Sequence, residues 1–471
     1  MSTKLQWLIW FVMTIGLAGY LAYSLVAQPA ESARIFLPGV TTHGHFQIEL
    51  QCHECHSEDL NAGVKNDACI KCHGADLQRS TDTHPKSKFT DPSKAHMVRK
   101  LDGRTCLSCH QEHVPDRTLA MGVSLPADYC WHCHQEVGEQ RPSHAGMAYD
   151  SCATAGCHNY HDNRALFEKF LVNHYGEPDM LDVMMTPESD LAALWAKENP
   201  DAKPLSESDA DAPSSVDYED AVMHEWSTTA HAAAGVNCTS CHTNDDGVWS
   251  DSLSHDACRS CHEQQVDTFV EGRHGMRLAV GLSPMKPADA RLPMNHDMLH
   301  AELNCVACHG DHEFDVRYAA ADGCLRCHDD EHSVAYKEST HYELWRAEVE
   351  GAAEARTGVS CATCHMPREK NDDGEFFVQH NQNNNLRPNE KMGKNVCGNC
   401  HGLQFTLDAL ADDELVRSNF QGLPSGRVES IDMAKAWSDE RARLREERKR
   451  ARERKKALQA ESAPTAGRPA A

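Results

Sequence analysis

The chain opens with one long apolar run and is polar almost everywhere after it. Residues 7–27 form 21 positions without a charge, preceded by Lys4 and rich in Leu, Ile, Val and Ala. A run of this length can span a bilayer, whereas the apolar region of a cleavable signal peptide usually has about 7–15 residues. Aromatic side chains lie toward its two ends, as at membrane interfaces: Trp7, Trp10, Tyr20 and Tyr23. We therefore expect residues 1–30 to hold an uncleaved transmembrane anchor, with a removed signal as the alternative, and the chain to be exported in either case.

After residue 30 the apolar positions no longer form long runs, and the mean hydropathy of the chain is −0.59. Residues 163–174 carry apolar side chains at helical spacing and predict a short helix. Residues 434–456 hold 11 Lys and Arg against 5 Asp and Glu and predict a charged helix, followed through residue 471 by a tail that we expect to be disordered. Such a run is usually a solvated face, and docking on anionic lipid or on an acidic partner is the alternative.

Residues 177–220 differ from the segments on either side because they contain no Cys or His. They carry 13 acidic residues against Lys197 and Lys203, and prolines and serines interrupt them repeatedly. This composition predicts an acidic interdomain linker with one helix around residues 191–197.

Cysteine and histidine recur in a fixed pattern in the rest of the chain. Ten segments place two cysteines three positions apart with a histidine directly after the second: Cys52/Cys55/His56, Cys69/Cys72/His73, Cys106/Cys109/His110, Cys130/Cys133/His134, Cys238/Cys241/His242, Cys258/Cys261/His262, Cys305/Cys308/His309, Cys324/Cys327/His328, Cys361/Cys364/His365 and Cys397/Cys400/His401. An eleventh segment, Cys152/Cys157/His158, has four residues between its cysteines. Together the eleven segments use all 22 cysteines of the chain.

C-x-x-C-H is the attachment motif of a c-type haem, in which two thiols bond to the porphyrin and the adjoining imidazole binds the iron. Within one helical turn, residues i and i+3 share a face and i+4 lies beside them, so a single short segment holds the macrocycle. Zinc ribbons and disulfides of an exported protein are the competing interpretations, but neither requires a histidine after the second cysteine. We therefore expect eleven covalently attached haem c groups.

Composition agrees with a core built on cofactors. Apolar residues make up 40% of the chain but aromatic residues only 6%, and residues 43–401 provide about 33 residues per haem. That length suffices for ligand loops and short helices but not for sheets. The predicted fold is mainly α with extensive irregular structure and little or no β-sheet, in haem-cored modules behind one transmembrane helix.

The motifs fall into two modules with an internal repeat. We place a five-haem module at residues 31–176 and a six-haem module at residues 221–433. Residues 67–73 match residues 256–262, and residues 106–113 match residues 305–312, each of the latter pair with an extra His seven residues after its first Cys. This predicts duplication of a four-haem unit.

Histidines outside the motifs are candidates for the second axial position of each iron. The chain has 31 histidines, of which 11 are proximal, so 20 remain for at most 11 distal positions. The candidates in the first module are His43, His45, His84, His96, His113, His144, His161 and His174, and those in the second are His231, His274, His300, His312, His332, His341 and His380. The imidazole of His113 is expected to bind a haem other than that of His110, because the two axial positions lie on opposite porphyrin faces.

Two known families resemble parts of this sequence. The His-rich lead-in before Cys52 and the stretched motif at Cys152 are similar to cytochrome c3. Residues 357–368 (TGVSCATCHMPR), the pair Gln379-His380 and residues 391–401 (KMGKNVCGNCH) resemble the end of the haem domain in the hydroxylamine oxidoreductase and octahaem cytochrome superfamily. The segments around His274 and His341 resemble distal-ligand segments of that superfamily. These resemblances imply a multihaem c-type cytochrome, and no residue here matches the superfamily's catalytic haem or its cross-linking tyrosine.

Two histidine ligands saturate an iron and lower its potential, which favours electron carriage over substrate binding. We therefore expect a membrane-anchored periplasmic electron-transfer protein without catalytic residues, its haem modules outside the cytoplasmic membrane. The alternative is an oxidoreductase acting on a small nitrogen or sulfur compound, such as nitrite, hydroxylamine or tetrathionate, at one open haem. A haem-bearing subunit of a quinol-oxidising complex is a third possibility.

Charge constrains the partners of the protein. The formal net charge is −25, and haem propionates would make the surface more acidic. Nucleic acid binding is therefore not expected. A redox partner with a basic docking face is the natural complement.

Overall fold

The computed structural model describes residues 2–26, 34–57, 64, 66–80, 84–119, 122–141, 144–152, 160–161, 166, 168–182, 186, 191–244, 246–371, 373–386 and 391–461. Nearly all regular elements in these ranges are short helices separated by irregular segments. The strands β1 (Arg368–Lys370) and β2 (Phe376–Val378) pair antiparallel in the register Arg368–Val378. The predicted fold class, mainly α with almost no sheet, is thus confirmed.

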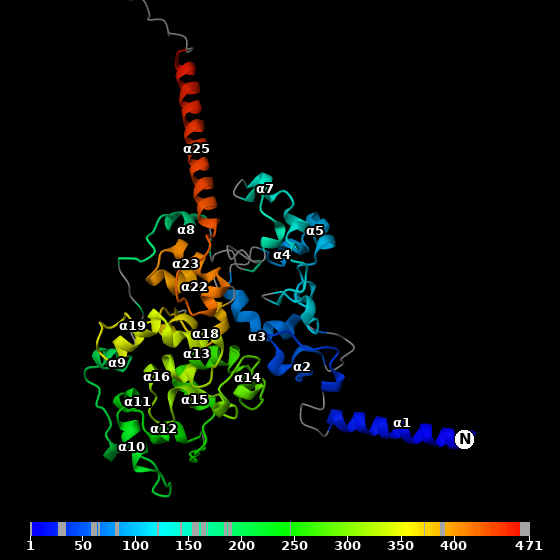
Figure 1. The fold of residues 1–471 in the computed structure, drawn as a ribbon, viewed down its shortest axis with the longest axis vertical. Helices are drawn as coiled ribbons and strands as arrows, with labels where there is room; N and C mark the ends of the chain where they lie inside the picture. Colours follow the sequence, from blue (N-terminus) through cyan, green and yellow to red (C-terminus); the bar gives the residue numbers. More distant parts are fainter. Residues whose placement is uncertain are drawn as a thin grey trace, which may run out of the picture.

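The N-terminal helix α1 (Thr3–Val26) stands apart from the rest of the molecule (Figure 1). Its apolar side chains are largely exposed, with Trp7 and Trp10 packed edge to face at 5.7 Å between ring centres. Among the described helices, α1 alone is long and apolar enough to cross a membrane.

The first module consists of short helical turns, most of which contain or adjoin a motif. They are η2 (Phe46–Ile48), α2 (Cys52–Cys55), α3 (Asn66–Arg79), α4 (Ser87–Thr90), η4 (Pro92–Lys94), α5 (Ala95–Lys100), η5 (Cys106–Ser108), η6 (Pro115–Arg117), α6 (Trp131–His134), α7 (Val137–Gln140) and η9 (Tyr149–Ser151). Cys157 and His158 of the stretched motif lie outside the described residues.

The acidic linker lies along the second module. Helix α9 (Leu191–Glu198) occupies the stretch where a helix is predicted, and η10 (Glu207–Asp209) follows it. The backbone N–H of Leu181 donates to the carbonyl of Cys400 at 2.8 Å, and that of Leu205 donates to Ala232 at 2.9 Å. The described residues between 180 and 211 are therefore held to the second module at several points.

The second module and its surroundings contain longer helices together with motif turns. They are α10 (Asp220–Ser227), α11 (Ala230–Ala233), α12 (Cys238–His242), α13 (His255–Glu271), α14 (Met276–Ala279), η11 (Pro287–Asp289), η12 (His296–Met298), α15 (Cys305–His309), α16 (Val316–Ala320), α17 (Asp322–Leu325), α18 (Glu331–Ala335), η13 (Tyr336–Glu338), α19 (Thr340–Val349), α20 (Cys361–His365), α21 (Gln382–Leu386), α22 (Lys391–Asn395), η14 (Cys397–Asn399), α23 (Leu403–Leu410) and α24 (Asp413–Arg417).

The longest helix, α25 (Ser430–Glu461), begins in the hydrophobic core and then extends away from the molecule (Figure 1). Its first turns pack against α23 and against α8 (Glu168–Asn173), the helix predicted at residues 163–174. The shared core consists of Leu166, Leu171, Leu403, Leu407, Ile431 and Ala434. An ion pair between Arg441 and Glu168 extends this contact. Residues at the end of the first module thus belong to the same core as the C-terminal helices.

The two modules also meet at a polar contact near their first and middle motifs. The side-chain amide of Gln47 donates to the carbonyl of Arg273 at 2.7 Å, and the guanidinium of Arg277 donates to the carbonyl of Gln47 at 3.2 Å. Arg273 also donates to Nε2 of His43 at 2.7 Å. This contact places the segment before Cys52 beside the segment that carries His274.

Candidate haem-binding sites

The motif segments form single helical turns because a capping residue precedes several of them. Asn304 accepts a hydrogen bond from the backbone of Ala307 at 3.0 Å, and Ser360 accepts one from Thr363 at 3.1 Å. Asn237 caps α12 in the same way. Such caps satisfy backbone donors at the first turn. The turn then places the two cysteines of a motif on one face.

Nine histidines of the motifs lie opposite a second imidazole. The ring-centre distances are 5.9 Å for His45–His73, 6.0 Å for His84–His134, 6.3 Å for His110–His161, 5.9 Å for His231–His262, 6.1 Å for His242–His312, 6.1 Å for His274–His328, 6.4 Å for His309–His380, 6.1 Å for His332–His365 and 6.3 Å for His341–His401. Each pair joins one motif histidine to one histidine outside the motifs.

This spacing fits one iron atom between the two rings. A metal–imidazole bond is about 2 Å long and the ring nitrogen lies about 1.1 Å from the ring centre, so two axial imidazoles place their centres about 6.3 Å apart. Direct packing of two rings does not require such uniform spacing. Among the described residues, no group of three or more His, Cys, Asp or Glu side chains converges as a metal site of the protein alone. The donor set therefore fits haem, which brings the four equatorial nitrogens itself.

Hydrogen bonds at Nδ1 orient many of these rings. Nδ1 lies within hydrogen-bonding distance of a backbone carbonyl in His84 (Tyr160, 3.0 Å), His110 (Gly122, 3.0 Å), His242 (Ser250, 2.8 Å), His332 (Val416, 2.5 Å), His380 (Val378, 2.8 Å) and His401 (Asp179, 3.2 Å). In His45 the acceptor is the Glu112 carboxylate at 2.6 Å. An imidazole that donates from Nδ1 presents Nε2 as the lone-pair donor to a metal.

Burial keeps these imidazoles in the form that binds metal. It lowers the pKa of three of them to about 4, and the facing imidazole is the next cause: His274 facing His328, His309 facing His380, and His365 facing His332. The pKa of His341 is lowered by burial and by His401. A neutral imidazole is the ligand form, so the site favours coordination at neutral pH.

Glu112 shows how a carboxylate supports one pair. Burial would raise its pKa, but hydrogen bonds from His45 and from the backbone and hydroxyl of Thr42 outweigh burial and lower the pKa to about 2. The anion is therefore present at neutral pH and stays bonded to the His45 ring. Glu112 is not among the site residues that the sequence predicts, although it lies between two histidines of the segment Cys-His-Gln-Glu-His.

Consecutive motifs are neighbours in space as well as in sequence. Thiols of consecutive motifs lie close enough for one to shift the pKa of the other in the pairs Cys69–Cys106, Cys130–Cys152, Cys258–Cys305 and Cys324–Cys361. In four other cysteines burial is the main cause of a raised pKa, and the thiolate charge of a cysteine in the next motif adds to it. They are Cys55 (beside Cys72), Cys241 (beside Cys258), Cys308 (beside Cys324) and Cys364 (beside Cys400). The attachment points thus follow one another closely within each module.

The predicted attachment thiols differ in exposure and in their contacts, and Cys133 and Cys261 are two examples. Cys133 is half-buried in α6, and in the described part of the chain no hydrogen bond joins its sulfur to a thiol of another motif. Cys261 is exposed on α13, where the Ser260 hydroxyl donates to its sulfur at 3.8 Å, and it acts on Cys241 through charge alone. Each is the second cysteine of its motif, and its first cysteine, Cys130 or Cys258, makes the contact between motifs instead. Attachment of the motif cysteines to porphyrins, Cys133 and Cys261 included, stays a prediction from the motifs.

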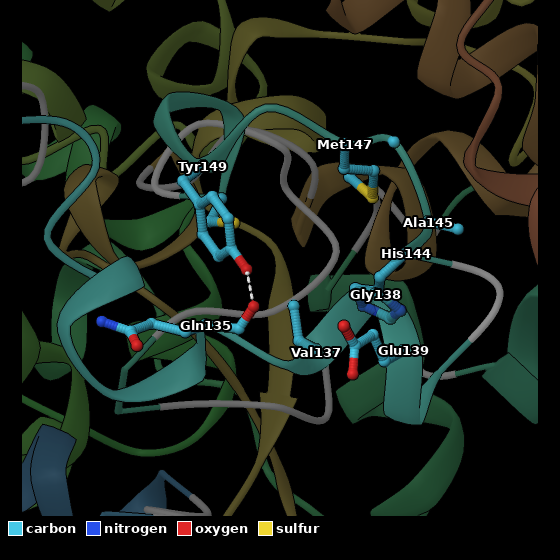
Figure 2. A pocket seen from close by; sticks show the side chains of 10 residues that line it. Gln135, Val137, Gly138, Glu139, His144, Ala145, Met147 and Tyr149 are labelled. Atoms are coloured by element: carbon cyan, nitrogen blue, oxygen red, sulfur yellow. Dashed lines mark hydrogen bonds between the residues drawn. The ribbon is translucent and has the colours of Figure 1, made fainter.

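A cavity of about 320 Å³ adjoins the stretched motif (Figure 2). Val137, His144, Met147 and Tyr149 line it, and so does Cys152. The Tyr149 hydroxyl donates to the carbonyl of Gln135 at 2.7 Å, which fixes one wall. Burial lowers the pKa of His144, and the positive charge of Arg141 lowers it further. The cavity combines a predicted attachment thiol, apolar side chains and an imidazole whose pKa is lowered, which is the chemistry a haem requires.

The structure separates the distal candidates into two groups. Those brought opposite a motif histidine are His45, His84, His161, His231, His274, His312, His332, His341 and His380. In the described part of the chain His43, His96, His113, His174 and His300 do not take such a position. His174 instead contacts Glu177 at 2.6 Å and packs on Phe170. His56 faces no second imidazole among the described residues, and its buried Nδ1 has no hydrogen-bond partner there.

Comparisons with known proteins agree with this geometry. The family model for cytochrome c3 matches residues 44–135 and 230–329, and that for cytochrome c552 matches residues 331–414. Cytochrome c-552 of Haemophilus influenzae strain 86-028NP is 23% identical over 186 residues, which cover 31% of this chain and 32% of that protein. Cytochrome c-552 of H. influenzae strain ATCC 51907 / DSM 11121 / KW20 / Rd gives the same values. The chain thus spans about a third of the length of these relatives. No solved structure matches.

The motifs, the imidazole pairs and these matches define a class of protein with covalently bound haem c. The chain is a multihaem c-type cytochrome. The cytochrome c3 match covers both copies of the internal repeat, so its likeness extends farther into the second module than the motifs alone indicate. Residues 331–414 form a distinct C-terminal part similar to cytochrome c552.

Proposed function

We propose that this protein is a membrane-anchored periplasmic cytochrome with eleven haems that transfers electrons between a membrane donor and a periplasmic or outer-membrane acceptor. The observation that carries the proposal is the set of nine imidazole pairs at 5.9–6.4 Å. An iron held between two imidazoles has no position for a substrate. Bound haem supplies one-electron oxidation and reduction, and the chain sets its ligands, its surroundings and its distance from the next site.

The motifs and the imidazole pairs support the following residue roles. The cysteines of the eleven motifs bind the porphyrins as thioethers, and the adjoining histidines are the proximal ligands. The nine histidines that face them are the distal ligands. For the stretched motif, the cavity in Figure 2 favours His144 as the distal ligand of the haem at Cys152, Cys157 and His158.

The short distance between successive attachment points supports electron transfer from haem to haem rather than isolated haem sites. Thiols of successive motifs lie close together, for example Cys258 and Cys305, and would hold the porphyrins attached to them near each other. Short separation is what the protein contributes to electron transfer, together with a low local dielectric.

The exposed apolar helix α1 supports retention in the inner membrane as a single-pass anchor. Fractionation of cells that make the full chain tests this. Retention of the haem protein in membranes after a high-salt wash, with residues 1–26 still present in the purified chain, is the expected result. A soluble protein lacking them would establish a cleaved signal instead.

A second function, oxidation or reduction of a small nitrogen or sulfur compound, has one observation in its favour: His56 faces no imidazole among the described residues. The optical and electron paramagnetic resonance (EPR) spectra of the oxidised protein separate the two functions. All-low-spin ferric iron, with no carbon monoxide binding after reduction, is expected for the electron carrier. A high-spin haem that binds nitrite or hydroxylamine would identify an enzyme.

The net charge of −25 supports docking of a basic redox protein, or of a quinol-oxidising membrane complex with a basic face. Crosslinking of the full-length protein in membranes, followed by identification of the captured chains, tests this. Capture of acidic proteins alone would contradict it.

A further inference from the structure

We infer that His113 is the second axial ligand of the haem attached at Cys52, Cys55 and His56. The inference rests on the proposed function, because it assumes that this motif carries a haem. It gives a second ligand to the haem of His56, which faces no imidazole among the described residues. It also assigns a role to His113, which belongs to none of the nine imidazole pairs.

The internal repeat provides the first argument, because it relates ligands as well as motifs. His45 and His231 each lie seven residues before the first cysteine of their repeat, and each faces the histidine of the second motif. His84 and His274 lie 11 and 12 residues after the second motif, and each faces the histidine of the fourth motif. The pairing scheme is therefore the same in both copies where both are seen.

The third motif follows the same rule. Its histidines, His110 and His309, face His161 and His380, which lie beyond the fourth motif in each copy. Only the first motif of each copy is left to compare. In the second copy its His242 faces His312 at 6.1 Å with the rings 14° apart. The equivalent of His312 in the first copy is His113, since each lies three residues after the histidine of the third motif.

The imidazole of His113 is already oriented as a metal ligand by its local contacts. Its Nδ1 lies 2.8 Å from the carbonyl of Gly39, as Nδ1 of six histidines in the pairs lies near a backbone carbonyl. Donation from Nδ1 leaves the lone pair on Nε2 for a metal. The ring is half-buried, and its backbone has a φ of +62°, which non-glycine residues adopt only where surrounding contacts hold them.

Gly39 is shaped to accept this arrangement. A Cβ added at Gly39 would lie 2.8 Å from the carbonyl oxygen of His113, which is backbone and cannot move aside cheaply. At nearby Gly44, the nearest atom to such a Cβ is 3.9 Å away. The two glycines therefore form a matched pair for testing the Gly39–His113 contact.

His43 is the other histidine near the start of the first copy, and its chemistry differs. Its Nε2 accepts from the Arg273 guanidinium at 2.7 Å, so the lone pair that would bind iron is engaged by a cation. It has no counterpart in the second copy, where residue 229, two before His231, is a threonine. The repeat and the hydrogen bonding both favour His113.

The test uses the full-length haem-loaded protein with the variants His113→Ala and His113→Met. His113→Ala is expected to keep eleven haems, to convert one from low spin to high spin, and to bind one carbon monoxide per chain after reduction. His113→Met is expected to keep that haem low-spin, with a methionine-ligated spectrum and a raised potential. His312→Met should produce the same change in the second module, and His224→Ala, an exposed histidine outside the motifs, should produce none.

Gly39→Ala keeps the imidazole and supplies a second measurement if His113→Ala loses a haem. It is expected to change the EPR signal and potential of one haem, whereas Gly44→Ala leaves both unchanged. Wild-type protein with a high-spin haem that His113→Ala does not alter would overturn the inference, as would unaltered spectra in every His113 and Gly39 variant. The haem count of the same samples tests the proposed function separately, since a chain with few or no haems would refute that function whatever His113 does.

Discussion

Each imidazole pair joins a histidine that a motif fixes to one that arrives from elsewhere in the chain. The angle between the two rings varies widely. The rings of His110–His161 and His242–His312 are nearly parallel, at 19° and 14°, whereas those of His84–His134 and His332–His365 are nearly perpendicular, at 89° and 87°. Ring orientation decides how the iron d orbitals split, so the sites are not magnetically equivalent.

We therefore predict two classes of low-spin ferric signal in the EPR spectrum of the oxidised protein. Near-parallel rings give rhombic signals, and near-perpendicular rings give highly anisotropic ones. Replacing His332 with Met should remove intensity from the anisotropic class only, and replacing His161 with Met should remove it from the rhombic class only. A spectrum with one class, or loss from the wrong class, would show that the rings turn when haem binds.

At this scale the motifs predict the proximal histidines, and the histidines outside the motifs supply the distal candidates. His231, His274, His312, His332, His341 and His380 were all candidates, and all face a motif histidine. Their pairing could not be predicted, because His380 reaches His309 across 71 residues and sequence distance sets no constraint over such a span. His300 satisfies the same composition argument but faces no motif histidine in the described part of the chain. Glu112 was missed because nothing in its spacing marks a carboxylate that orients an imidazole.

The cysteines show the same limit of the sequence pattern. The motif treats both thiols of a pair alike, yet Cys258 contacts the next motif while Cys261 is exposed, and Cys130 contacts Cys152 while Cys133 does not. Spacing fixes which cysteines share a helical face, but the packing of one motif on another decides which thiol is enclosed.

Among the elements, α25 shows how one helix serves two environments. Its first turns contribute Ile431 and Ala434 to the core shared with α8 and α23, and Ile431 is 1% exposed. Beyond Arg441 the helix is surrounded by solvent and carries most of its basic side chains. The sequence predicted the charged helix, but not that its start is a core element, because five apolar positions at residues 431–437, interrupted by two charged ones, give only a weak pattern.

Ile431→Ala is predicted to loosen the start of α25. Removing this buried side chain should lower the local stability of the helix by about 2–5 kcal/mol, since the lost contacts leave a cavity. Tryptic release of the basic end, followed by mass spectrometry of the native protein, measures local opening. Leu458→Ala is the control, because Leu458 is 66% exposed and its loss should change stability by less than about 0.5 kcal/mol. Equal cleavage rates in both variants would show that the core does not hold the helix.

Over the whole molecule, the three apolar clusters found in the described residues are small, which leaves cofactors as the main core. The sequence predicted this from the low aromatic content and the density of motifs. It did not predict that the acidic linker lies along the second module. Bonds such as Leu205 to Ala232 are made by backbone groups, and residue composition carries no signal for them.

The number of haems is a prediction for the whole chain. A pyridine haemochrome assay on the purified protein should give eleven haems per chain. The double variant Cys152→Ser/Cys157→Ser should give ten, because no thiol remains in that motif to form a thioether and the other motifs stay intact. His144→Ala should keep eleven but open one iron, if the cavity in Figure 2 is the site of that haem. A wild-type count of ten, unchanged in the double variant, would show that the stretched motif carries no haem.

Basic and acidic residues are distributed unevenly along the chain, and their distribution determines which surface should attract a charged redox partner. Residues 434–456 carry 11 basic against 5 acidic residues, while the remainder of the chain carries 35 basic against 66 acidic. A basic partner is therefore attracted by the haem modules and repelled by the exposed end of α25. Both forces weaken with salt, because the Debye length falls to about 10 Å at 0.1 M ionic strength.

Electron transfer to mammalian cytochrome c, a basic probe, should consequently slow as salt is added. At low salt, electron transfer from a chain that ends at residue 440 should be faster than from the full chain. A chain that ends at residue 461 keeps the whole helix and serves as the control. Stopped-flow measurement of cytochrome c reduction at several salt concentrations provides the rates. If the chain ending at residue 440 is slower instead, the basic helix is itself a docking element. Anionic vesicles that bind the full chain but not the shortened one would then identify a lipid surface as its target.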